Sequence, residues 1–80
     1  MQVVKLHKSI DELVEHLSQA VKNINWSYWR QNFVAFQEYS SCWDKAIYKI
    51  YSRDGLVLVV TYDNGEFDWY IESMINCYCE

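Results

Sequence analysis

Apolar side chains recur at helical spacing in the first third of the chain. At about 100° per residue they form one stripe along a helix, and they are Ile10, Leu13, Val14, Leu17, Val21 and Ile24. Ser9 and Glu12 match a capping box, in which the serine hydroxyl accepts from a first-turn N–H and the glutamate reaches back. The pattern therefore predicts an amphipathic helix over residues 10–24. Residues 2–7 are a candidate short strand ahead of it.

The segment 26–43 allows two interpretations and holds seven of the fourteen aromatic residues of the chain. Read as a strand, its apolar and polar side chains do not separate onto two faces. Read as a helix, four large side chains share one side within about 80° of each other: Trp26, Trp29, Phe33 and Phe36. This spacing favours a second helix over residues 27–39, with a strand as the alternative.

From residue 45 onward the pattern changes to the period of two that is typical of strands. Residues 45–52, 56–62 and 66–73 read as three strands, separated by Asp54-Gly55 and Asn64-Gly65. Both dipeptides favour two-residue hairpin turns, which need positive φ at their central positions. The chain has only two glycines, and both lie in these turns. The sequence therefore predicts a three-stranded antiparallel meander.

Two-residue turns would also set which strand residues face each other. The second turn pairs Val60 with Trp69, and the first pairs Tyr51 with Leu58. The face expected against the helices then carries Ile47, Tyr51, Leu58, Val60, Tyr62, Phe67, Trp69 and Ile71. The opposite face carries Tyr48, Ile50, Val57, Val59, Thr61, Asp68, Tyr70 and Glu72. Because this second face mixes apolar and polar residues, we expect the C-terminus to cover part of it, or a partner to bind it.

These elements predict one α+β domain over residues 1–80, with a helical N-terminal half packed on the meander. Eighty residues suffice for one hydrophobic core. Each enclosed aromatic side chain buries about 150–250 Å². Fourteen aromatic residues exceed what so small a core encloses, so we expect several of them to remain partly exposed.

Charge and cysteine content narrow the function classes. A net charge of −4 disfavours direct binding to nucleic acid, which depends on lysine and arginine. The longest apolar run, residues 56–60, is too short to span a bilayer, and the N-terminus lacks the apolar segment of a signal peptide. Three cysteines, an odd number, fit a reducing compartment. We therefore expect a cytoplasmic protein that contacts neither membrane nor nucleic acid.

Metal and thiol chemistry has weak support in the sequence. Cys77 and Cys79 form the one close cysteine pair, and a metal site would need Cys42, His7 or His16 to join it through folding. A Cys42–His16 nucleophile pair is formally possible, but nothing in the local sequence brings the two together. Three reduced cysteines, some packed as small apolar residues, explain the same pattern. We expect no metal ion.

Catalysis by phosphate-binding loops or paired carboxylates is no better supported. Phosphate-cradling loops need glycines, and both glycines are used in hairpins. The pair Asp63/Glu66 flanks a turn, and Asp68/Glu72 resembles a charged strip that protects an edge strand from aggregation. We therefore expect neither an enzyme nor a bound cofactor.

Tyrosines outside the predicted core favour a protein-binding role, because exposed tyrosine rings are typical of interaction hot spots. Tyr28 and Tyr39 lie off the helical stripe, while Tyr48 and Tyr70 fall beside two carboxylates on the second sheet face. The candidate binding residues are thus Tyr28, Tyr39, Tyr48, Asp68, Tyr70 and Glu72.

The hypothesis that follows is a small acidic module that docks on a larger protein, as an inhibitor or adaptor, and blocks a basic cleft sterically. In size and acidity the chain is similar to phage-encoded anti-defence inhibitors, including anti-CRISPR proteins, and to toxin-immunity proteins. This is a similarity of class that no motif carries. The alternatives are a homodimer formed through strand 66–73 or the second sheet face, and a metal- or thiol-dependent enzyme.

Overall fold

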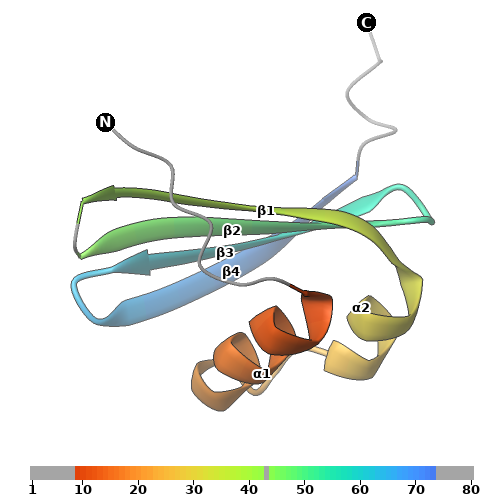
Figure 1. Ribbon diagram of the computed structural model, residues 1–80, viewed down its shortest axis with the longest axis horizontal. Coiled ribbons are helices and arrows are strands. Elements are labelled where there is room, and N and C mark those ends of the chain that lie inside the picture. The colour runs from red at the N-terminus through yellow and green to blue at the C-terminus, as the bar shows by residue number, and fades with distance from the viewer. Residues whose placement is uncertain (1–8, 43, 74–80) are drawn as a thin grey trace, which may run out of the picture.

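The structure, a computed structural model, describes residues 9–42 and 44–73. Within them two helices precede four strands: α1 (Ile10–Ala20), α2 (Trp26–Asn32), β1 (Phe33–Cys42), β2 (Lys45–Ser52), β3 (Leu56–Asp63) and β4 (Glu66–Ser73). The strands form one antiparallel sheet in the order β1-β2-β3-β4. Both helices lie on the same side of it (Figure 1). The α+β class is confirmed, with four strands rather than three. The candidate strand 2–7 lies outside the described residues.

Helix α1 begins as predicted and ends early. The Ser9 hydroxyl accepts from the Glu12 N–H at 3.3 Å, so one half of the predicted capping box is present. The helix stops at Ala20, because Val21 takes an extended conformation while its N–H still bonds the Leu17 carbonyl at 2.8 Å. The Trp26 indole N–H donates to the Val21 carbonyl at 2.7 Å. The apolar stripe predicted a helix up to residue 24, but residues 21–25 form a linker between α1 and α2. The Trp26 bond holds the start of this linker in place.

The predicted helix 27–39 is wrong beyond Asn32. The Asn25 side chain caps α2 by accepting from the Tyr28 N–H at 3.3 Å, and Phe33 already has extended backbone angles. From there the chain runs as β1 along β2. Trp29 and Phe36 both contact the core, but Trp29 does so from α2 and Phe36 from β1 rather than from one helix. Backbone pairing with β2 outweighs the weak local preference of the segment, as is common for strands.

The turn between β3 and β4 is the predicted one. Asn64 and Gly65 have φ angles of 52° and 88°, as a two-residue type I′ turn requires. Tyr62 pairs with Phe67, and the rest of the predicted β3–β4 register follows from it. The residues of β4 that face away from the helices are therefore the ones that the sequence predicted.

The turn between β2 and β3 differs by one residue from the prediction. Only Gly55 has a positive φ there, at 86°, and its N–H donates to the Ser52 carbonyl at 3.1 Å. The loop thus has three residues, 53–55, a turn followed by a left-handed glycine. Tyr51 pairs with Val57 instead of Leu58. A slip of one residue turns every side chain of a strand to the other face, so the predicted facing of β2 is wrong.

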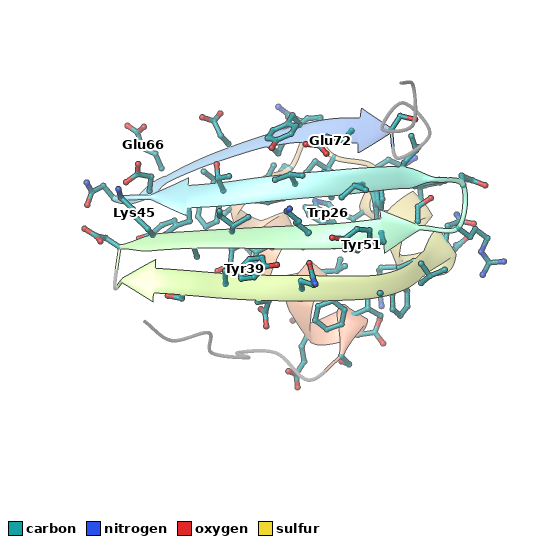
Figure 2. All side chains as sticks on the ribbon, turned by 90° about the horizontal axis from the view of Figure 1, so that it is seen from above. Trp26, Tyr39, Lys45, Tyr51, Glu66 and Glu72 are labelled. Atoms are coloured by element: carbon teal, nitrogen blue, oxygen red, sulfur yellow. The ribbon has the colours of Figure 1, made fainter. Side chains whose placement is uncertain are left out.

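The hydrophobic core lies between the helices and the sheet. Leu13 and Leu17 of α1 meet Ile50, Leu58 and Val60 of the sheet, all without exposed surface. Half-buried aromatic side chains surround this centre: Trp26, Tyr28, Phe33, Phe36, Tyr62, Phe67 and Trp69. Neither helix covers the opposite face of the sheet, and Trp26 lies behind the strands when that face is viewed (Figure 2).

Candidate protein-binding surface

The face of the sheet turned away from the helices is called the open face below. Alternate residues of all four strands reach it, as the strand pairing requires. Its members are Ala35, Gln37, Tyr39, Lys45, Ile47, Lys49, Tyr51, Val57, Val59, Thr61, Asp63, Glu66, Asp68, Tyr70 and Glu72. Figure 2 shows this face with no described helix or strand in front of it.

Two tyrosines on the open face are held by one amide. The hydroxyls of Tyr39 and Tyr51 both donate to the Oε1 atom of Gln37, at 3.1 and 3.0 Å. Tyr39 lies on β1 and Tyr51 on the adjacent strand β2, at different points along the sheet (Figure 2). Both side chains are half-buried. Because their hydroxyls are already restrained, a partner that contacts these rings has little side-chain freedom left to remove.

Valines lie at the centre of the open face, and side chains of the neighbouring strands surround them. Val59 is 2% exposed although neither α1 nor α2 covers it, and its cross-strand neighbours are Lys49 and Tyr70. Val57 is opposed in the same way by Tyr51 and Glu72. Directly opposed side chains lie in contact range, so long side chains shield the small ones. The open face consequently presents tyrosines and charged groups to solvent.

Two large apolar side chains of this face remain exposed. Ile47 is 39% exposed and Tyr70 is 50% exposed. Beside Ile47 lies a shallow hollow of about 280 Å³ that Tyr39, Lys45 and Thr61 also line. A hollow with an apolar wall and charged rim is typical of surfaces that receive a side chain of a partner.

Carboxylates gather along the β4 side of the open face. We call Asp63, Glu66, Asp68 and Glu72 the acidic strip; all four are exposed. Glu66 and Glu72 lie towards opposite ends of β4 (Figure 2). The basic residues of the open face, Lys45 and Lys49, are on β2, so negative charge is concentrated at one edge of the sheet.

The structure places four of the six candidate residues on the open face: Tyr39, Asp68, Tyr70 and Glu72. Tyr48, which the predicted register put beside Tyr70, is instead a core residue and only 5% exposed. Its ring centroid lies 6.2 Å from that of His16. Burial raises the pKa of Tyr48, and the negative charge of Glu38 adds to this. Tyr48 is therefore not available on the open face.

Tyr28 lies on the helix side of the molecule and links α2 to the loop between β2 and β3. Its hydroxyl donates to Asp54 Oδ2 at 2.6 Å and lies 2.8 Å from Ser52 Oγ. Since its one proton goes to Asp54, Ser52 donates in the second bond. The bond to the Asp54 carboxylate raises the pKa of Tyr28. These contacts are intramolecular, and they explain the presence of Tyr28 without a partner.

Sequence reasoning missed part of the open face, namely Gln37, Ile47, Lys49 and Tyr51. Gln37 was assigned to a helix, and Ile47 and Tyr51 were predicted to face the core. For the three β2 residues the signal is the tripeptide before β3, because Arg53-Asp54-Gly55 suits a three-residue loop as well as a two-residue one.

Other kinds of site find no support in the described part of the chain. Within residues 9–42 and 44–73, no three histidine, cysteine or carboxylate side chains are placed to hold a metal ion. Cys77 and Cys79 lie outside that part. Neither α1 nor α2 is long and apolar enough to cross a membrane. Comparison with protein families, curated proteins and solved structures finds no match for this chain.

Proposed function

We propose that this chain is a protein-binding module that docks on a basic surface of a partner protein through the open face and acts as an inhibitor or adaptor by steric blocking. The observation that carries the proposal is a sheet face that neither α1 nor α2 covers, on which restrained tyrosines lie on the same side as an acidic strip. Rigid aromatic rings with polar tips supply most of the binding energy in many interfaces.

Charge favours one class of partner over another. The acidic strip repels phosphates, which disfavours the use of the tyrosines as stacking platforms for nucleic-acid bases. The same carboxylates attract lysine and arginine side chains, and complementary charge speeds association. A protein surface with a basic cleft therefore fits the open face better than a nucleic acid does.

The test is capture of the partner followed by titration of the purified pair. The double variant Tyr70→Ala, Asp68→Lys changes the most exposed tyrosine of the face and reverses one carboxylate. We expect it to weaken binding by at least about thirtyfold, the effect of one hot-spot residue. Glu15→Lys on α1 is the matched control, since it reverses an exposed charge on the helix side.

Two results are decisive. Loss of binding in the double variant with full binding in Glu15→Lys supports docking through the open face. Equal binding of wild type and double variant overturns it. The partner's own activity, measured with and without the bound chain, then separates an inhibitor from an adaptor.

A further inference from the structure

In the described part of the chain, strand β4 pairs through one side of its backbone and leaves the other side open. Among residues 9–42 and 44–73 it pairs with β3 alone, and Figure 2 shows no described element beyond it. Asp63 and Glu66 flank a two-residue turn and form a hydrogen-bonded pair, and such pairs alternate along an antiparallel ladder. The N–H and C=O groups of Phe67, Trp69 and Ile71 are therefore directed at the open edge.

The helix-facing side of this edge is hollowed. Two depressions follow β4 there: one of about 470 Å³ between residues 20–23 and the pair Phe67 and Trp69, and one of about 300 Å³ between residues 23–25 and the pair Trp69 and Ile71. We call them together the β4 trench. Ile71, at its end, is 47% exposed. The carboxylates that guard this edge against aggregation lie on the open face, whereas the helix-facing side carries an exposed isoleucine.

The other side of the same edge is acidic. Glu66, Asp68 and Glu72 project from β4 onto the open face, with the exposed ring of Tyr70 among them. Because side chains alternate along a strand, an added strand would meet carboxylates with every second residue and the trench with the residues between.

We infer that the β4 edge binds an extended segment of a partner protein by strand addition, and that this segment alternates basic and apolar residues. Backbone hydrogen bonds to Phe67, Trp69 and Ile71 provide the affinity, and the alternating side chains provide the specificity, as in other cases of β-augmentation. This inference rests on the proposed function and specifies the contact by which the partner docks.

A second copy of this chain fits the same edge poorly. Antiparallel pairing of two β4 strands about Trp69 would place Glu66 of one copy opposite Glu72 of the other. Like charges directly opposite each other destabilise a strand pair. Charge complementarity thus selects a basic segment over self-pairing.

The probe for the test is an acetylated, amidated octapeptide of alternating lysine and valine, titrated into the ¹⁵N-labelled full chain. We expect chemical-shift changes and slower amide exchange at Phe67, Trp69 and Ile71, because their N–H groups gain acceptors. The control peptide has the same sequence with N-methyl groups on the edge-facing amides. Equal binding of the methylated peptide overturns strand addition, as do shifts confined to Tyr39 and Tyr51.

A pair of variants tests the same edge from the protein side. Ile71→Pro removes an N–H that no strand of the sheet uses, a substitution that edge strands tolerate, and Ile71→Ala removes the side chain alone. We expect the proline variant to lose octapeptide binding about tenfold more than the alanine variant. Equal loss in both would show that only the side chain matters and would overturn the backbone pairing.

The outcomes also separate this inference from the proposed function. One outcome is that the octapeptide fails to bind while binding of the captured partner still requires Tyr70 and Asp68. That result would overturn strand addition and would support docking through the open face. If light scattering shows a dimer that Ile71→Pro abolishes, the edge belongs to a second copy of the chain and the inference falls.

Discussion

The two faces of the sheet use the same strands but protect their apolar residues in different ways. On the helix side, Leu58 and Val60 lie beneath a packed layer formed by α1 and α2. On the open face, Val59 is nearly as buried, and within the described part of the chain neither helix covers it, while Lys49 and Tyr70 lie opposite it on the neighbouring strands. A packed layer holds each residue in place, whereas long side chains adjust. Removing apolar atoms should therefore destabilise the fold more on the helix side than on the open face.

The largest expected effect is on the helix side. Leu58→Ala empties a site without exposed surface, and it should lower the free energy of unfolding by about 2–5 kcal/mol. Ile47→Ala on the open face, where the side chain is 39% exposed, should cost about 1.5 kcal/mol or less. Chemical denaturation of the two variants checks both values. Similar losses of unfolding free energy in the two variants would contradict the difference between the faces.

Two neighbouring valines give a closer comparison, since Val60 is 0% and Val59 is 2% exposed and they face opposite sides of the sheet. Val60→Ala should cost about 2 kcal/mol, from two methyl groups and the cavity that they leave. Val59→Ala should cost clearly less, because the side chains of Lys49 and Tyr70 can move into the space. A larger loss for Val59→Ala in the same denaturation experiment would mean that the open face is a rigid core.

The turn between β3 and β4 sets which β4 side chains reach the open face. The stability of the fold should depend on the glycine in this turn. Gly65 has a φ of 88°, and no atom lies within 4 Å of a Cβ placed there. Gly65→Ala should therefore cost about 1–2 kcal/mol through backbone conformation alone. Gly65→Asn, which tolerates positive φ, should cost less. Thermal unfolding of both variants measures the difference, and an alanine variant as stable as wild type would contradict the left-handed turn.

The smallest expected effect is a dependence on alkaline pH that comes from the helix side. The pKa values of Tyr48 and Tyr28 are raised above 10.0, by burial and by the bond to Asp54 respectively. Their contribution to stability is complete below pH 10 and declines as the pH rises through the folded-state values, because the unfolded chain then releases protons first.

The measurement is the free energy of unfolding at about pH 9 and at about pH 11. Tyr48→Phe should reduce the loss between these two values, since one of the two tyrosines no longer ionises. An unchanged loss in that variant would show that Tyr48 does not contribute to the alkaline transition.

Local signals predicted the parts of the fold that are decided within a few residues. The Ser9 cap, the apolar stripe of α1 and the Asn64-Gly65 turn all act between close neighbours in the sequence. Because that turn sets the register of β4, the sequence also predicted that Asp68 and Tyr70 share one face. This part of the candidate surface was therefore accessible without a structure.

Local sequence patterns were sufficient to predict the α+β class, the start of α1 and the β3–β4 hairpin. They did not predict that residues 33–42 form β1, or that Tyr51 rather than Tyr48 reaches the open face. The physical reason is the same in both cases. Both sides of β2 carry apolar residues, and residues 33–38 fit a helix or a strand, so local preference was nearly balanced. Backbone pairing and the length of one loop, which depend on the rest of the fold, settled the balance.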